Sequence, residues 1–263
     1  MDSKPDKQKS CNETTVEKHG NIAIMRFTRQ PLFATTNLRE RARILNCLQQ
    51  LIADAGVKVI IIFGAPDKSG PSEYGDFLDA AAAADDKYIY KMLTMFNQLI
   101  LNIVHCPKAV MYVDSGAVLS QFLHMSLACD YRLVSEDTIF HKAYLDQAMV
   151  PKGGGAWFLR RMLGVTRAFD LLTNSRPMSA QEALDMGLIH EIAPANSLQT
   201  WALERAHDLA LIPTSSLAGI KSLLHFPVSE LETYLEHENM ELFRAFTRMR
   251  TTRQRAGENS RPG

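Results

Sequence analysis

The spacing of apolar residues in the first quarter of the chain predicts a strand, a helix and a second strand. Apolar and polar residues alternate at 21–27, whereas at 38–51 apolar residues recur every three or four positions, as in an amphipathic helix. The run at 57–64 is short, rich in Val and Ile, and ended by Gly64. Such a run is typical of a strand that is buried on both faces.

The same alternation continues downstream and gives way to helices in the last third of the chain. A loop rich in Gly, Pro, Asp and Ser covers 64–75. Further elements are expected as helices at 85–104 and 119–127, strands at 107–113, 131–134 and 138–140, and helices at 180–186, 198–211 and 229–250. This order predicts an α/β fold with a parallel-rich sheet followed by a helical C-terminal region.

The chain is long enough for one α/β core, and its pattern divides it into four parts. We expect a tail at 1–14, the core at 15–195, a helical region used for assembly at 196–250, and a second tail at 251–263. The arginine-rich run within 248–261 is interpreted as solvated.

Composition and charge narrow the function classes. Lys and Arg together number 29, as do Asp and Glu, so no basic surface for nucleic acid is expected. No apolar run approaches the ~20 residues that cross a bilayer, and the polar N-terminus lacks the pattern of a signal or transit peptide. These features predict a soluble, cytoplasmic protein. The four widely separated cysteines include no CxxC pair, which predicts reduced thiols and no metal site.

Four segments resemble, in order and spacing, the enoyl-CoA hydratase/isomerase (crotonase) superfamily over about residues 15–250. They are the strand and loop ending in Glu73-Tyr74-Gly75-Asp76, the strand, turn and buried helix from Pro107 to Cys129-Asp130, the segment from Phe140 to Pro151-Lys152-Gly153-Gly154-Gly155, and the stretch from Ala180 to Pro194 with Gly187-Leu188-Ile189. The resemblance implies a crotonase-like spiral ββα core. It also implies that the C-terminal helices assemble a homotrimer or a hexamer.

The resemblance implies an oxyanion hole made by the backbone N–H groups of Glu73 and Gln121. Two such donors stabilise negative charge on a thioester oxygen by about 3 kcal/mol each in a dry site. Family members usually have glycines where this chain has Ser120, Gln121 and Phe122. Either the hole persists with a different shape or Phe122 fills it.

The two glutamates of a hydratase in this family fall on His124 and Tyr144. A tyrosine with a pKa near 10 is a poor general base, so hydration is not expected. His124 is either a general base with a pKa near the working pH or a buried histidine bonded to a carbonyl. Tyr144 is either a hydrogen-bond donor to the substrate or a pocket wall, and Asp146 is either a catalytic carboxylate or a turn cap.

Recognition of CoA departs from the family pattern. A lysine that usually follows the oxyanion-loop aspartate is replaced by Phe77, and a Phe…Lys helix that is usual at the C-terminus is missing. His141 and Lys142 are expected at the surface, and His190-Glu191 is expected to serve packing. Gly153-Gly154-Gly155 is interpreted as a helix N-terminus and not as a nucleotide loop. No cofactor is implied apart from CoA as part of the substrate.

Three functions remain open from the sequence. The first is an enzyme that acts on an acyl-CoA or carrier-linked substrate through an enolate, as an isomerase, decarboxylase or hydrolase, with His124 and Tyr144 in place of the glutamates. The second is a hydrolase that cleaves carbon–carbon bonds of free β-diketones without CoA. The third is a degenerate family member that serves assembly, with Gln121, Phe122 and Tyr144 closing the pocket.

Overall fold

The computed structural model describes residues 6–259 except 12–13, 29–31, 33–37 and 66–69. The strands are β1 Asp6–Cys11, β2 Thr14–His19, β3 Ile22–Phe27, β4 Val59–Phe63, β5 Ala109–Asp114, β6 Ala117–Leu119, β7 Tyr131–Ser135, β8 Ile139–His141, β9 Met178–Ser179 and β10 Glu191–Ala193. The helices are α2 Leu38–Ala53, α3 Pro71–Ala83, α4 Asp86–His105, α5 Ser120–Ser126, α6 Ala143–Asp146, α7 Gly155–Thr173, α8 Ala180–Asp185, η1 Ala195–Ser197, α9 Leu198–Ala210, α10 Thr214–Leu224 and α11 Val228–Asn259.

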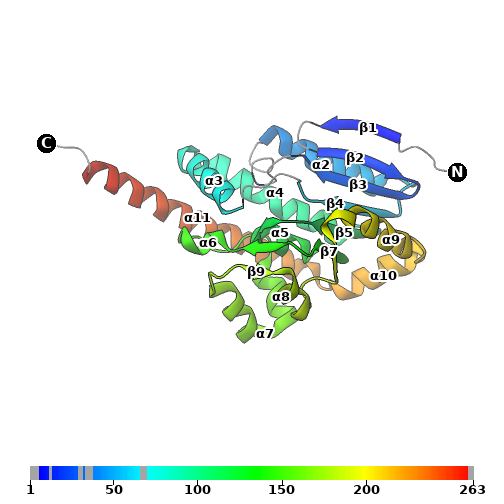
Figure 1. The fold of residues 1–263 in the computed structure, drawn as a ribbon. Coiled ribbons are helices and arrows are strands. Elements are labelled where there is room, and N and C mark those ends of the chain that lie inside the picture. Colours follow the sequence, from blue (N-terminus) through cyan, green and yellow to red (C-terminus); the bar gives the residue numbers. More distant parts are fainter. Residues whose placement is uncertain (1–5, 12–13, 29–31, 33–37, 66–69, 260–263) are drawn as a thin grey trace.

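The larger sheet is mixed, with strand order β1-β2-β3-β4-β5-β7-β10 (Figure 1). β1, β2 and β3 pair antiparallel, and β3, β4, β5, β7 and β10 pair parallel. The parallel part was expected from the βα alternation. The expected tail at 1–14 instead contains β1, which pairs with β2 at the edge of the sheet. Its residues lack the apolar alternation by which the other strands were recognised.

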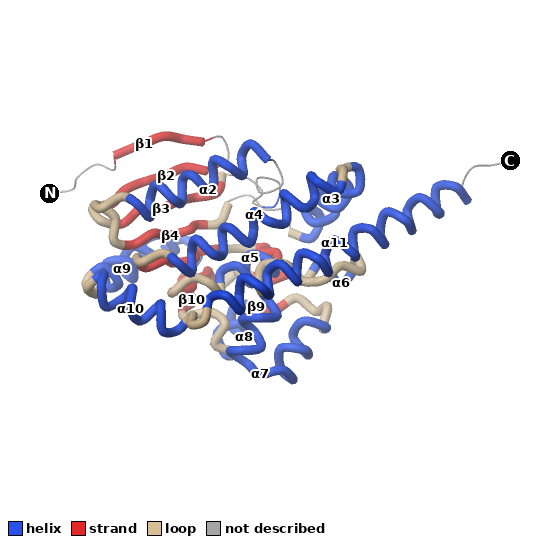
Figure 2. The backbone as a smooth tube through the Cα atoms, turned by 180° about the vertical axis from the view of Figure 1, so that it is seen from behind, coloured by secondary structure: helices blue, strands red, loops and turns tan. Residues whose placement is uncertain are grey.

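Both faces of the parallel strands are covered, as the β-branched run predicted. In β4, Ile60 and Ile62 belong to the core on the side of α2 and α4, and Val59 and Ile61 belong to the core on the side of α9. Figure 2 shows α2 and α4 crossing one face of this sheet. Side chains that alternate across a strand thus pack into two apolar layers, which holds the strand ends rigidly in place.

A second, smaller sheet carries the elements that build the candidate site. β6 pairs parallel with β8, and β8 pairs antiparallel with β9. Gly116 turns the chain from β5 into β6 with a φ of 64°, a backbone conformation that favours glycine. β6 then runs directly into α5, whose seven residues are all buried.

Helix α3 occupies part of the segment that was expected to be a loop. The prediction placed loop over 64–75, but α3 begins at Pro71, which stands at the N-terminal position where proline suits a helix. The alanine run at 80–83 then favours continuation of the helix. The segment Glu73-Tyr74-Gly75-Asp76 therefore lies in the first turns of a helix.

Helix α11 is longer than expected and projects from the body of the protein (Figure 1). The second expected tail, at 251–263, is helical as far as Asn259. Two arginines of the run that was expected to be solvated form ion pairs: Arg250 with Asp86 at 2.8 Å and Arg253 with Asp79 at 2.7 Å. These acids lie on α4 and α3, so the pairs connect α11 to both helices.

The described part of the chain contains no helix with the length and apolar character needed to cross a membrane. Cys47, Cys106 and Cys129 are free thiols. Burial raises the pKa of the Cys129 thiol to about 12, so this group is uncharged and packs as a small apolar residue.

Candidate functional site

Helix α5 presents two polar side chains inside the apolar core. Gln121 and His124 are both buried and lie three residues apart, on the same side of the helix. Gln121 is in the first turn, where backbone N–H groups have no acceptor within the helix. A buried helix that begins with unsatisfied donors is suited to holding an anionic oxygen.

A small cavity lies where α3, α4, α5 and α11 meet, and we call it the α3–α5 cavity. Its volume is about 20 Å³, close to the room that a single water needs. Its lining is apolar apart from Gln121 and Lys152, and comprises Leu32, Tyr74, Phe77, Met92, Leu93, Phe96, Gln121, Lys152, Leu242 and Phe246. Tyr74 contacts Phe77, and Phe77 contacts Phe246 edge-on, so these three rings form a connected part of the wall.

Gln121, which lines this cavity, has a side-chain nitrogen without a hydrogen-bond partner. Nε2 is buried and has no hydrogen-bond partner among the described residues. Leaving such a donor unpaired costs about 1–3 kcal/mol. The sequence singled out Gln121 for its backbone N–H, and the structure adds the side chain as a second donor at the same place.

Glu73 does not line the α3–α5 cavity, although its neighbour Tyr74 does. Its backbone N–H donates to the carbonyl of Gly70 at 3.2 Å, within the first turn of α3. Its buried carboxylate accepts a hydrogen bond from the N–H of Leu32 at 2.8 Å. The N–H that was predicted as an oxyanion donor is therefore engaged by the helix in this structure.

His124 is held against the start of α7. Its Nδ1 donates to the carbonyl of Lys152 at 3.1 Å, and a Cβ on Gly155 would lie 2.5 Å from the ring. Burial lowers the pKa of His124 to about 4, against the smaller opposing effect of the Lys152 carbonyl. The ring is therefore neutral at pH 7. His124 does not line the α3–α5 cavity.

Tyr144 lies beside His124, with 6.5 Å between the ring centroids. Its hydroxyl donates to the carbonyl of Leu172 at 2.8 Å, and burial raises its pKa above the usual value. Asp146 ends α6 in an exposed position. The structure thus brings His124 and Tyr144 together and leaves Asp146 outside the group.

A buried ion pair that the sequence reasoning missed closes one side of the site. The Lys152 ammonium donates to Glu238 at 3.0 Å, Asn97 at 2.5 Å and Asn239 at 2.8 Å. The Glu238 carboxylate also accepts from the N–H groups of Gly153 and Gly154, at 3.0 and 2.9 Å. The glycine turn is therefore the N-terminus of a helix, α7, as expected. The anion that its backbone N–H groups bind is the carboxylate of Glu238 on α11.

Two other sequence expectations concern residues near the site. Lys142 was expected at the surface but is buried, because β8 leads straight into α6 beneath the end of α7. His190 accepts a hydrogen bond from the N–H of Arg132 at 3.2 Å and stacks on Tyr131, while Glu191 accepts from the Tyr131 hydroxyl. These contacts agree with a packing role for His190 and Glu191.

Replacing His124 with glutamine is expected to weaken the dependence of stability on pH. The unfolded histidine has a pKa near 6.5 and the folded one about 4, so the unfolded state binds more protons between these values. Stability is therefore unaffected above pH 6.5 and falls as the pH drops toward 4, by on the order of 3 kcal/mol from this group.

Urea unfolding of both proteins at pH 7 and pH 4.5 measures this effect. His124→Gln should lose about 2–3 kcal/mol less than the wild type between the two pH values. The exposed His237→Gln is the matched control and should behave as the wild type does. Equal losses in His124→Gln and the wild type would show that His124 is protonated in the folded protein.

The comparisons with known proteins point to a single family. The model described as enoyl-CoA hydratase/isomerase matches residues 17–258. A probable enoyl-CoA hydratase of Rhodobacter capsulatus is 26% identical over 209 residues, which cover 79% of this chain and 79% of that protein. The 4-chlorobenzoyl coenzyme A dehalogenase-2 of Arthrobacter is 23% identical over 231 residues, 87% of this chain and 84% of that protein.

The comparison with solved structures indicates the same fold family as the sequence comparisons. An enoyl-CoA hydratase from Bacillus halodurans matches with a TM-score of 0.79 at 23% identity, over 91% of this chain and 98% of the other. This similarity confirms the crotonase-like fold that the sequence predicted. The family match spans nearly all described elements, from β2 to α11. The chain therefore belongs to the enoyl-CoA hydratase/isomerase family, the crotonase superfamily of enzymes.

Proposed function

We propose that this chain binds an acyl thioester, linked to CoA or to a carrier, and transfers a proton next to its carbonyl without hydrating it. The observation that carries the proposal is the unpaired, buried Nε2 of Gln121 at the start of α5. A thioester carbonyl in the α3–α5 cavity would supply the missing acceptor. The reaction needs no further cofactor.

The electrostatics of the cavity favour an enolate. Its walls are apolar, so a donor there is worth about 3 kcal/mol to a developing oxyanion. Gln121 offers its side-chain N–H in addition to the backbone N–H of the first turn of α5. A leucine at this position would take up a similar volume without an unpaired polar atom, so the amide is a costly choice unless a ligand accepts from it.

His124 supplies the proton acceptor in this proposal. A pKa of about 4 gives the imidazole the basicity of an ordinary glutamate, whose pKa is about 4.3. Because Nδ1 donates to the Lys152 carbonyl, Nε2 is the ring nitrogen left to accept a proton. His124 lies three residues after Gln121 on α5 but does not line the α3–α5 cavity, so in this proposal the side chains around its ring must move before it reaches a substrate proton.

Hydration would need a second group to activate water, and neither of the other two residues that the sequence pointed to, Tyr144 and Asp146, is suited to this. Tyr144 holds its proton because burial raises its pKa, and its hydroxyl donates to Leu172. Asp146 is exposed, outside the group. Isomerisation needs only carbonyl polarisation and one proton carrier, so we propose an isomerase-type reaction ahead of decarboxylation or hydrolysis.

A thermal-shift screen with CoA, acetyl-CoA and acetoacetyl-CoA tests this function. A ligand at one hundred times its Kd adds about 2.7 kcal/mol of stability, which for this chain length raises Tm by roughly 5–10 °C. The acyl-CoA thioesters should raise Tm more than free CoA does. Gln121→Leu should lose this difference in Tm shift, and the exposed Gln98→Leu should keep it. No shift with any thioester would reject the proposal.

A second candidate, an assembly protein without catalysis, is favoured by one observation. The α3–α5 cavity holds little more than a water, so an acyl chain enters only if aromatic side chains move. In this candidate Tyr74, Phe77 and Phe246 keep the site closed. A missing thermal shift together with a well-defined oligomer would favour it.

We propose in either case that the chain forms a homotrimer or a hexamer. The end of α9 and α10 expose large apolar side chains, among them Leu211, Leu223, Leu224 and Phe226, which are 68–83% exposed. An apolar surface of this kind marks an interface. Light scattering at micromolar concentration should give three or six times the chain mass, and Leu223→Asp should reduce it. A wild-type monomer would contradict the proposed assembly.

A further inference from the structure

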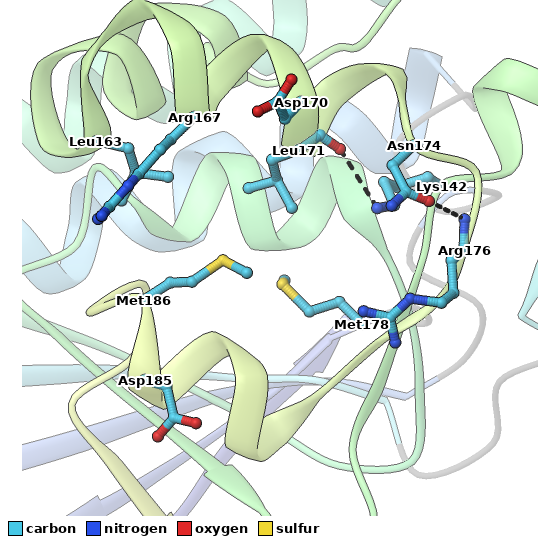
Figure 3. A pocket seen from close by; sticks show the side chains of 10 residues that line it. All are labelled: Lys142, Leu163, Arg167, Asp170, Leu171, Asn174, Arg176, Met178, Asp185 and Met186. Atoms are coloured by element: carbon cyan, nitrogen blue, oxygen red, sulfur yellow. Dashed lines mark hydrogen bonds between the residues drawn. The ribbon is translucent and has the colours of Figure 1, made fainter.

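A second cavity, of about 380 Å³, lies between the C-terminal half of α7 and the segment of β9 and α8 (Figure 3). It shares no lining residue with the α3–α5 cavity. Its size is within the usual range for small-molecule sites. We call it the α7–α8 cavity.

A buried lysine faces this cavity with one weak partner. Lys142 is 7% exposed, and its ammonium donates to the carbonyl of Leu171 at 3.3 Å. No carboxylate among the described residues lies within ion-pair distance of it. Burial lowers the pKa of Lys142, as does the neighbouring Arg176, and Glu182 opposes them. Two of the three ammonium protons are left for a ligand.

Two arginines add positive charge to the same cavity. Arg176 is paired with Glu182, but a guanidinium has five N–H donors and this pair uses few of them. Arg167 forms no hydrogen bond or ion pair within the described part of the chain. Asp170 and Asp185 also line the cavity, and in Figure 3 their carboxylates point away from Met178 and Met186.

The centre of the cavity is apolar. In Figure 3, Met178 and Met186 reach toward one another between the arginines, and Leu163 and Leu171 lie across from them. Methionine side chains adapt their shape to flexible ligands. The cavity therefore joins a cationic end, at Lys142 and Arg176, to an apolar middle.

We infer that the α7–α8 cavity binds a small organic carboxylate with an apolar body. Lys142 and Arg176 hold the carboxylate, and Met178 and Met186 contact the body. A charge-assisted pair with an ammonium that lacks a carboxylate partner is among the stronger polar contacts in proteins. This site is separate from the proposed acyl-thioester site and does not depend on it.

Methyl NMR of the full chain labelled with [methyl-¹³C]methionine tests the inference. Hexanoate should shift the Met178 and Met186 signals saturably, with assignments from Met178→Leu and Met186→Leu, and should leave Met92 of the α3–α5 cavity unchanged. Hexylammonium, with the same apolar body and the opposite charge, should shift neither signal.

Variants of Lys142 separate binding from packing. Lys142→Met should weaken hexanoate at least tenfold, Lys142→Arg should keep most of the affinity, and the exposed Lys87→Met should keep all of it. If Lys142→Met does not fold, two comparisons still test the inference. They are hexanoate against hexylammonium on the wild type, and hexanoate binding by Lys142→Arg against the wild type. Unaffected binding in Lys142→Met, equal shifts with hexylammonium, or no saturable shift at Met178 and Met186 would overturn the inference.

Discussion

Replacing Lys152 with methionine is expected to lower the free energy of unfolding by about 3–5 kcal/mol. The change removes the only ammonium in contact with the buried Glu238 carboxylate among the described residues, and leaves Asn97 and Asn239 without their shared donor. A buried charge without its partner is among the largest single destabilising effects. Because Glu238 lies on α11, the loss loosens the contact between α11 and the glycine turn.

Urea unfolding measures this loss, with the exposed Lys87→Met as control. Glu238→Gln also leaves a buried charge without its ionic partner, but three oxygens can still accept from the Lys152 ammonium, so it should cost less than Lys152→Met. The double variant Lys152→Met, Glu238→Gln should be more stable than the sum of the single losses predicts, because it leaves no unpaired charge. A loss below about 1 kcal/mol in Lys152→Met would mean that water solvates Glu238.

The elements that carry strong periodicity could be predicted from the sequence. The β-branched run at 57–64 gave β4, and the apolar run at 119–127 gave α5 as a buried helix. The short strands β6, β9 and β10 could not be predicted in this way, because their two or three residues carry no period and, unlike β8 at 139–141, were not recognised as separate apolar runs. They form through tertiary pairing with β8 and β7.

The candidate site was located by family resemblance and only partly by chemistry. Position on α5 pointed to Gln121 and His124, but the unpaired Nε2 and the lowered pKa depend on neighbours from other elements. The Lys152–Glu238 pair joins residues 86 positions apart, and no local pattern signals such a contact. The one feature of the sequence that could have indicated a buried charge here is Lys152, which stands directly before the three glycines.

Crotonyl-CoA is expected to be hydrated more than a hundred times more slowly than the ~10 per second of a median enzyme. The reason is that hydration needs two groups, one to activate water and one to handle the α-proton. Among the described residues the proposal assigns a base role to His124 alone, since the buried carboxylates of Glu73 and Glu238 accept backbone hydrogen bonds. Tyr144 keeps its proton, and its hydroxyl donates a hydrogen bond to the carbonyl of Leu172. Proton transfer at the α-carbon needs only His124 and the donors of Gln121, so this half of the chemistry should remain.

The most direct measurement is deuterium incorporation into 3-butenoyl-CoA in D₂O, followed by NMR together with the formation of any hydrated product. The wild type should incorporate deuterium at the α-carbon faster than a protein-free sample and give no 3-hydroxy product. Gln121→Leu should slow incorporation about 10²-fold or more, because a donor to the developing oxyanion is lost, whereas Gln98→Leu should match the wild type. Incorporation at the protein-free rate, or rapid appearance of the hydrated product, would contradict the proposed function.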